Sequence, residues 1–238
     1  MKMPRTRERQ YQFLLDYRDS QGLETMGLMS SQSWYDDPRR LGFMLARYKF
    51  VSKMFAGFDS ALEVGCGDGF GARIVRQEVK RLTAVDFDPE FVADAKAHMR
   101  PRWRFEVKVH DMLKGPVPGL FRGIYALDVL EHIRPGHEHA FLANMVKSLA
   151  PHGSMIIGMP SLESQAYASP QSKAGHVNCQ TQAQLRATMA RHFRNVFMFT
   201  MNDEVLGTGY AKMAHYLFAL CASPRARPRR PMDDYPGR

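Results

Sequence analysis

Short apolar runs alternate with amphipathic stretches through the middle of the chain. Runs of strand length begin at Ala61 and recur near 82–86, 104–109, 123–127 and 154–159. Residues with helical spacing of apolar side chains lie between them, at 71–79, 89–99 and 138–149. Strands that alternate with helices predict an α/β fold with a doubly wound parallel sheet.

Two helical stretches precede this alternation. Thr6 to Arg18 has apolar side chains at helical spacing, and the polar stretch that follows, through Ser33, predicts a loop. Asp37 and Pro38 then supply an N-cap and a first-turn proline for a helix to about Ala56. We therefore predict an N-terminal helical extension or lid over residues 1–57. Its aromatic residues Trp34, Tyr35 and Tyr48 are candidates to cover a ligand. The alternative is that they only pack against other apolar side chains.

The C-terminal part adds one helix and two strands to the predicted sheet. Thr181 to His192 has helical spacing, whereas 196–201 and 214–220 have the pattern of strands. From Ser223 the sequence is rich in proline and arginine, which predicts a disordered basic tail over 223–238. The predicted main domain is therefore 58–222.

Composition indicates a globular protein of the cytoplasm. The chain has 238 residues, of which 45% are hydrophobic, and no apolar run has the length of a membrane span. The N-terminus is charged and lacks the apolar stretch of a secretion signal. Its three cysteines, Cys66, Cys179 and Cys221, show no paired spacing that would indicate disulfides or zinc. These features predict no contact with a membrane and leave the oligomeric state open.

The net charge of +9 is concentrated at the two ends of the chain. Basic tails bind phosphates without sequence specificity, so a contact with RNA stays open. No aromatic residues are interleaved with the terminal arginines, which argues against a platform for single strands. Nucleic acid is therefore not the predicted partner.

A glycine-rich turn follows the first predicted strand, in the sequence ALEVGCGDGFG at 61–71. Gly65, Gly67 and Gly69 permit backbone conformations that other residues avoid and let a ligand approach the main chain. The Gly-x-Gly-x-x-Gly pattern of dinucleotide sites is not matched, because Phe70 takes the third glycine's place. Such a turn predicts a cofactor site or, alternatively, only a tight connection.

Acidic residues stand at the ends of the following predicted strands. Asp86 ends the second strand, Asp111 follows the third, and Asp128 follows the fourth, in the segment LDVLEHI. The carboxyl ends of parallel strands lie side by side and form the ligand crevice of such sheets. A carboxylate at the position of Asp86 is suited to accept two ribose hydroxyls.

As a set, these motifs resemble those of class I S-adenosylmethionine-dependent methyltransferases, from about Ala61 to Pro160. The resemblance implies a Rossmann-like, seven-stranded sheet whose last strand inserts antiparallel. It also implies S-adenosylmethionine as the cofactor. The implied cofactor-binding residues are Glu63, Gly65, Cys66, Gly67 and Gly69 for the methionine part, Asp86 for the ribose, Phe87, Asp111 and Met112 for the adenine, and Asp128. For Phe87 and Met112, ordinary packing is the alternative.

Methyl transfer from a sulfonium releases a neutral thioether, so the enzyme has to supply only positioning and a base for the acceptor's proton. The candidate catalytic groups near the crevice are Asp128, Glu131, His132 and His176. A structural role for His132 in its loop is the alternative.

The same four residues are similar to the ligand set of divalent-metal-dependent O-methyltransferases of ubiquinone synthesis and small-RNA end methylation. Carboxylates with imidazole suit magnesium or manganese, which would lower the pKa of an acceptor hydroxyl. Asp128 stands where those enzymes generally carry glutamate. The prediction is therefore an enzyme without a metal, with this site as its alternative.

The polar segment 160–180 follows the fifth strand and overhangs the predicted acceptor side. Its polarity favours a small polar acceptor, methylated on oxygen, such as a sugar, a sugar nucleotide or another hydroxylated metabolite. An RNA or protein methyltransferase that docks through basic termini, and a non-catalytic cofactor-binding module, are the alternatives.

Overall fold

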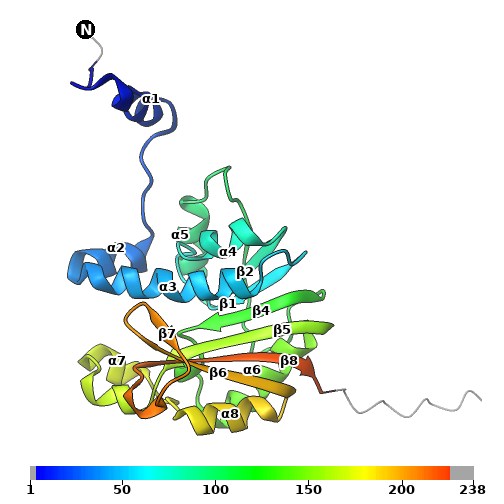
Figure 1. Cartoon of the computed structure of the whole chain (residues 1–238). Coiled ribbons are helices and arrows are strands. Elements are labelled where there is room, and N and C mark those ends of the chain that lie inside the picture. Colours follow the sequence, from blue (N-terminus) through cyan, green and yellow to red (C-terminus); the bar gives the residue numbers. More distant parts are fainter. Residues whose placement is uncertain (1–3, 226–238) are drawn as a thin grey trace, which may run out of the picture.

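One mixed sheet organises the chain in the computed structural model, which describes residues 4–225 (Figure 1). The strand order is β3-β2-β1-β4-β5-β8-β6-β7. The strands are β1 (Ala61–Val64), β2 (Leu82–Asp86), β3 (Glu106–Val109), β4 (Phe121–Leu127), β5 (Leu149–Pro160), β6 (Phe193–Asn202), β7 (Val205–Gly207) and β8 (Tyr216–Pro224).

The topology confirms the predicted doubly wound sheet. β1 to β5 pair in parallel, and β8 lies antiparallel between β5 and β6, as the resemblance implies. The sheet has eight strands where seven were expected, because the short β7 turns back onto β6. Asp203 makes this hairpin turn with φ 50°. A strand of three residues is too short to show a recognisable alternation of apolar and polar residues in the sequence.

Helices cover both faces of the sheet. The α-helices are α1 (Gln12–Gln21), α2 (Leu28–Asp36), α3 (Pro38–Met54), α4 (Ala72–Glu78), α5 (Pro89–Ala97), α6 (Pro135–Lys147), α7 (Pro170–Gly175) and α8 (Gln182–Ala190). Apolar residues of α6 and α8 fill one buried cluster, and those of α3, α4 and α5 fill the other. Short 3-10 turns lie at Arg9–Tyr11, Leu130–His132, Glu163–Tyr167 and Ala211–Met213.

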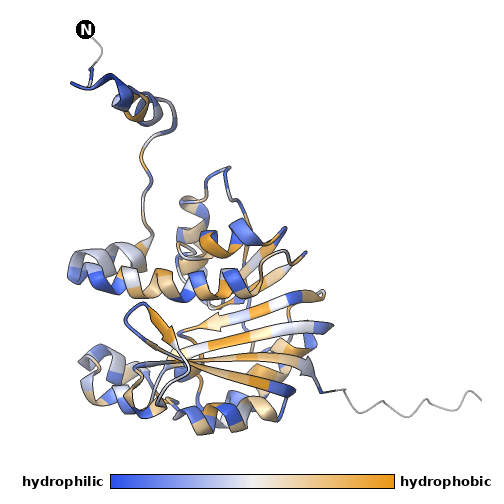
Figure 2. Cartoon of the chain, viewed as in Figure 1, coloured by the Kyte–Doolittle hydropathy of each residue, from blue (hydrophilic) through white to orange (hydrophobic). Residues whose placement is uncertain are grey.

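The N-terminal segment differs from the sequence prediction at α2. This helix occupies part of the stretch through Ser33 that was predicted as loop. The first turn of this helix is held by carboxylates from far along the chain, which the local pattern does not show. α1 has no buried residue and stands away from the body (Figures 1 and 2).

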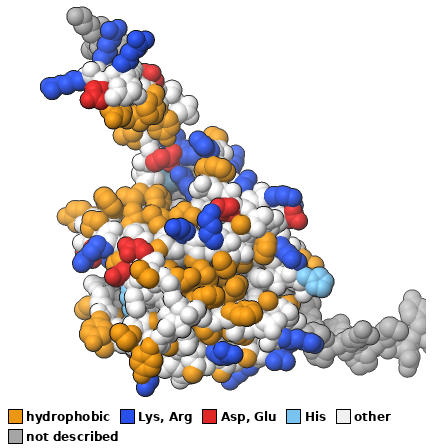
Figure 3. All heavy atoms as spheres, viewed as in Figure 1, with side chains coloured by type: hydrophobic (Ala, Val, Ile, Leu, Met, Phe, Trp, Pro, Cys, Tyr) orange, Lys and Arg blue, Asp and Glu red, His pale blue; other side chains and the backbone are white. Residues whose placement is uncertain are grey.

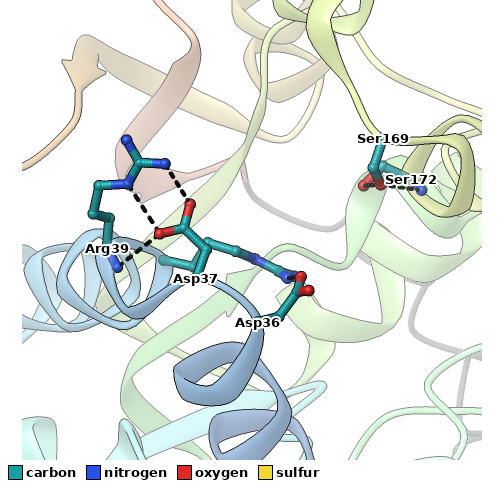
Figure 4. A network of polar contacts seen from close by, with 6 residues as sticks. Asp36, Asp37, Arg39, Ser169 and Ser172 are labelled. Atoms are coloured by element: carbon teal, nitrogen blue, oxygen red, sulfur yellow. Dashed lines mark hydrogen bonds and ion pairs between the residues drawn. The ribbon is translucent and has the colours of Figure 1, made fainter.

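Capping fixes the starts of α3 and α7. The Asp37 carboxylate accepts the backbone N–H of Arg39 and also pairs with its guanidinium (Figure 4). This matches the predicted N-cap. Ser169 caps α7 by accepting the N–H of Ser172 (Figure 4), so the polar segment 160–180 is partly helical.

β8 continues to Pro224, and residues 226–238 of the predicted basic tail lie outside the described residues, as does Lys2. Within residues 4–225, every helix is too short or too polar to cross a membrane. All three cysteines are free thiols.

A buried carboxyl joins three of these elements. Glu63, at 1% exposure, lies in β1, and its Oε1 accepts the hydroxyl of Tyr48 from α3 at 2.6 Å. Its Oε2 accepts the hydroxyl of Tyr125 from β4 at 2.9 Å. Burial raises the pKa of Glu63 to about 8, because the charged form loses hydration. The neutral carboxyl is therefore the form that this core accommodates at low pH.

Glu63 predicts a specific pH dependence of stability. A pKa that is higher in the folded than in the unfolded chain adds stability below the unfolded value and loses it as pH rises toward about 8. We expect the free energy of unfolding to fall by roughly 2–4 kcal/mol between about pH 5 and pH 8, and Glu63→Gln to remove this slope. Denaturant unfolding at several pH values measures it. Glu90→Gln, at an exposed site, should keep the wild-type slope, and the same slope in both variants would contradict the assignment.

Candidate functional site

The glycine-rich turn between β1 and α4 has the conformation that its sequence predicts. Gly65, Gly67 and Gly69 have φ values of 77°, 52° and 68°, in the left-handed region that favours glycine. A Cβ added to Gly65 would lie 2.3 Å from Val129 Cγ2. The turn therefore packs directly against the segment that follows β4.

Asp86 fixes this turn from the neighbouring strand. It ends β2 with 6% exposure, and its Oδ2 accepts the N–H of Gly67 at 2.9 Å. Its Oδ1 accepts the N–H of Asp88 at 3.0 Å. A carboxylate with two backbone donors keeps free lone pairs on both oxygens. Asp86 is thus held at the carboxyl edge of the sheet with acceptor capacity left for a ligand.

The other predicted cofactor residues are distributed between surface and core. Phe87 is 72% exposed beside Asp86, whereas Met112 is buried in the core, where its carbonyl accepts the amide of Asn144. Asp111 accepts the N–H of Leu113 in the turn after β3. Cys66 is buried, which raises the pKa of its thiol. Of these four residues, Phe87 and Asp111 reach the surface.

The first turn of α2 lies on the glycine-rich turn. Asp68 Oδ2 accepts the N–H of Ser30 at 2.7 Å, and Asp94 accepts that of Leu28 at 2.8 Å. A Cβ on Gly67 would lie 2.6 Å from Met29 Sδ, so Met29 covers this glycine. This contact could not be predicted from local pattern, because 38 residues separate Ser30 from Asp68.

The outer side of α2 is apolar. Figure 3 shows hydrophobic side chains gathered over this helix, where Leu28, Trp34 and Tyr35 are 58%, 53% and 92% exposed. Trp34 and Tyr35 are therefore exposed, and their role over a ligand stays a prediction. Tyr48 is buried instead, with its hydroxyl committed to Glu63.

Asp128 pairs with an arginine of α3. Both carboxylate oxygens accept from Arg47 Nη1, at 2.9 and 2.8 Å, and the Arg47 guanidinium lies 3.9 Å from the ring centroid of Tyr216. Asp128 has φ 57°, which directs the chain sharply away from β4. Arg47 was missed by sequence reasoning, because 81 residues separate it from Asp128.

Glu131 is a second buried carboxyl, at 1% exposure. Its Oε2 has no hydrogen-bond partner among residues 4–225, and burial raises its pKa well above the usual value. Its carbonyl accepts the N–H groups of Val177 and Asn178, which ties the segment before α6 to the segment after α7. This contact brings His176 to the site.

His132 and His176 stand together with fixed tautomers. His132 Nδ1 lies 2.9 Å from the carbonyl of Gly175, and His176 Nδ1 lies 2.8 Å from Gln165 Oε1. Each of these oxygens can only accept, so in the neutral rings Nδ1 carries the proton and Nε2 keeps a lone pair. The two ring centroids are 5.1 Å apart. Burial and the neighbouring His132 lower the pKa of His176, which keeps it neutral near pH 7.

Three of the four predicted catalytic residues meet here. Ligand atoms of Glu131, His132 and His176 all lie within 4.8 Å of one another. Asp128 is outside this group and is paired with Arg47. Two imidazole lone pairs and an unpartnered carboxyl oxygen can accept a proton or bind a divalent cation.

Comparison with known proteins agrees with the sheet and the turn. Residues 61–153 match the family model described as methyltransferase domain. A protein of Mycolicibacterium smegmatis named "Probable S-adenosylmethionine-dependent methyltransferase" is 27% identical over 116 residues, which cover 48% of this chain and 42% of that protein. The chain thus spans less than half the length of this relative.

Two further matches are a nodulation protein and the crystal structure of a nodulation methyltransferase. Nodulation protein S of Bradyrhizobium diazoefficiens is 29% identical over 142 residues, 57% of this chain and 68% of that protein. The crystal structure of N-methyltransferase NodS from Bradyrhizobium japonicum, in complex with S-adenosyl-L-homocysteine, superposes with a TM-score of 0.59 and 22% identity. It covers 76% of this chain and 86% of that chain, which shows a shared fold.

The contact between α2 and the glycine-rich turn generates a prediction. Asp68→Ala removes the acceptor for the Ser30 N–H and for that of Phe70, so we expect a loss of about 1–3 kcal/mol in stability. Amide exchange over 28–36 should become about tenfold faster or more, because α2 loses its docking contact. Asp36→Ala, which removes an exposed ion pair with Arg40, serves as the control. Unchanged exchange in Asp68→Ala would show that α2 is held by other contacts.

Proposed function

We propose that this chain, whose residues 61–153 form a class I S-adenosylmethionine-dependent methyltransferase domain, transfers a methyl group to a small polar acceptor. The observation that carries the proposal is the pair formed by Asp86 and the left-handed glycine turn at the carboxyl edge of the sheet. A strand-end carboxylate beside such a turn is suited to a nucleoside cofactor.

The residues present fit this cofactor. Asp86 has acceptor capacity for ribose hydroxyls, and Phe87 is exposed next to it for one face of the adenine. We expect Asp111, in the turn after β3, to meet the adenine amino group. The turn from Glu63 to Gly69 would hold the methionine part through its backbone, since the Glu63 carboxyl is bound by two tyrosines.

When bound, S-adenosylmethionine would supply an electrophilic methyl group on a sulfonium. Transfer of that methyl group leaves a neutral thioether. The chain's own task is to orient the acceptor and to take its proton. We assign the proton to Nε2 of His132 or His176, because their Nδ1 atoms are committed to oxygens that only accept. Burial and the neighbouring His132 lower the pKa of His176, so this lone pair stays available to a lower pH than in a free imidazole.

A small polar acceptor is favoured by the segment that frames the histidines. The turn Glu163–Tyr167 and α7 come from the polar segment 160–180, and Gln165 and Gly175 orient the two rings. A hydroxylated metabolite methylated on oxygen is our first candidate. A nitrogen acceptor is the second candidate, because this chain shares its fold with the N-methyltransferase NodS. Either atom must lose a proton, so the same histidines would serve.

A divalent metal is the alternative role of Glu131, His132 and His176. The residues fit a magnesium or manganese ion, since Glu131 Oε2 is buried and, within the described part of the chain, neither it nor the two Nε2 atoms have a hydrogen-bond partner. The ion would supply Lewis acidity toward an acceptor hydroxyl. Asp128 is an unsuitable fourth ligand in this conformation, because Arg47 binds both of its oxygens.

The cofactor assignment predicts the effect of Asp86→Ala. Loss of the carboxylate removes the ribose acceptor and frees the Gly67 N–H, so we expect S-adenosylhomocysteine to bind about tenfold more weakly or worse, as measured by calorimetry. Asp88→Ala is the matched control, because this neighbouring carboxylate only caps α5 and should leave the affinity unchanged. Equal affinity of wild type and Asp86→Ala would remove the ribose assignment.

A general-base role and a metal-binding role of the two histidines predict different results for the same variants. If the histidines act as bases, His132→Ala and His176→Ala lower turnover about 100-fold or more together, and a chelator has no effect. If they hold a metal, calorimetry with Mn²⁺ shows saturable binding that Glu131→Gln abolishes. His152→Ala, at an exposed site on β5, is the control and should change neither readout. Full activity in both histidine variants, with or without chelator, would exclude both roles.

A further inference from the structure

A large hollow lies where the parallel strands of the sheet begin, at the opposite end of the strands from the proposed cofactor site. It has a volume of about 940 Å³ and is lined where β1, β2, β3 and β4 begin, at Ala61, Leu82, Glu106 and Phe121. The glycine-rich turn, Asp86 and Asp128 are at the other ends of these strands. In Figure 1 the arrow of β4 points toward the side of α2 and α7, so the hollow faces the other way.

Positive charge dominates the lining of this hollow. It contains five cationic side chains, from Arg76, Lys80, Arg81, Lys96 and Arg104, and one acidic side chain, Glu106. Glu106 is already paired with Lys108 at 2.8 Å. Among residues 4–225, no hydrogen bond or ion pair engages the side chains of Arg81, Lys96 or Arg104. A concave surface with uncompensated charge of one sign concentrates its field and attracts counter-ions.

Helix dipoles account for part of this arrangement. Arg76 and Lys96 lie in the last turns of α4 and α5, where cations are favourable without any ligand. Lys80 pairs with Asp59 at 2.7 Å. Arg104, which precedes β3, has neither explanation. Arg81, which precedes β2, makes no hydrogen bond or ion pair among the described residues, although its charge helps to lower the pKa of Asp59.

One cation is held rigidly in place. Arg76 donates from Nε to the carbonyl of Arg104 and from Nη1 to that of Val79, both at 2.9 Å. Its guanidinium is thereby fixed at the wall while Nη2 stays without a partner among the described residues. A fixed guanidinium whose Nη2 has no partner is suited to donate to a phosphate oxygen.

The floor of the hollow is apolar. Leu82, Phe105 and Val107 form it with little exposure, and Leu120 stands 61% exposed at its rim. The volume falls within the range of roughly 300–1,000 Å³ that is typical of small-molecule sites. A ligand that fits both features carries several negative charges and also an apolar or aromatic body.

We propose that this hollow is a second binding site, for a small ligand with several phosphates and an aromatic body, of the chemical class of nucleoside polyphosphates. It is separate from the proposed cofactor site, because the length of the strands lies between them. The proposal rests on the lining residues alone and does not depend on the methyl transfer proposed above.

Calorimetry with ATP and with inorganic tripolyphosphate, at about 150 mM salt to screen diffuse attraction, tests the site on the full chain. The test variant combines Arg81→Gln, Lys96→Gln and Arg104→Gln, which are exposed residues whose side chains make no hydrogen bond or ion pair within residues 4–225. The control variant combines Lys49→Gln, Arg186→Gln and Arg194→Gln, which remove the same charge elsewhere on the surface. Affinity for S-adenosylhomocysteine is measured in all three proteins and should not change.

We expect saturable binding of ATP that is tighter than that of tripolyphosphate, weakened about tenfold or more in the test variant and about twofold or less in the control. Absence of saturable binding in the wild type, or equal losses in the two variants, would overturn the proposal. A single-stranded RNA that binds through the same three residues more tightly than ATP would also overturn it, because the hollow would then be part of a nucleic-acid surface.

Discussion

The hydrogen bonds from Tyr48 and Tyr125 to the buried Glu63 carboxyl hold the functional edge of the molecule together. They join α3, β1 and β4 at a point that water does not reach. The residue before Tyr48, Arg47, extends from the same helix to Asp128 at the end of β4. One helix therefore fixes the ends of the two central strands, and the glycine-rich turn and the segment with His132 both begin from those ends.

The glycine-rich turn is held from three directions by different kinds of contact. The Asp86 carboxylate accepts Gly67 N–H from the side of β2, Val129 packs on Gly65 from the side of β4, and α2 covers the turn through Asp68. The two ends of the parallel strands also differ in the charge of the side chains around them. The carboxyl edge gathers acids and histidines, whereas cations with few partners line the amino edge.

Local pattern predicted the elements that are built from local signals. β2 was predicted at 82–86 and is found there, and the Asp37 cap begins α3 as expected, because alternation and capping depend on neighbouring residues. α2 was predicted as loop, since its stabilising carboxylates, Asp68 and Asp94, are distant in sequence. The pairing of Arg47 with Asp128 was missed for the same reason. The roles of the individual site residues stay predictions, although the structure does bring Glu131, His132 and His176 together.

Methyl transfer from radiolabelled S-adenosylmethionine into an extract of the source cell, separated into acid-soluble and acid-precipitable fractions, tests the proposed activity most directly. We predict label in the soluble fraction, in a polar metabolite, at a rate that falls with Asp86→Ala. Label confined to the precipitate would contradict the small acceptor and favour a protein or RNA substrate. Label in neither fraction, from a protein that still binds the cofactor, would contradict the enzyme itself and favour a non-catalytic binding module.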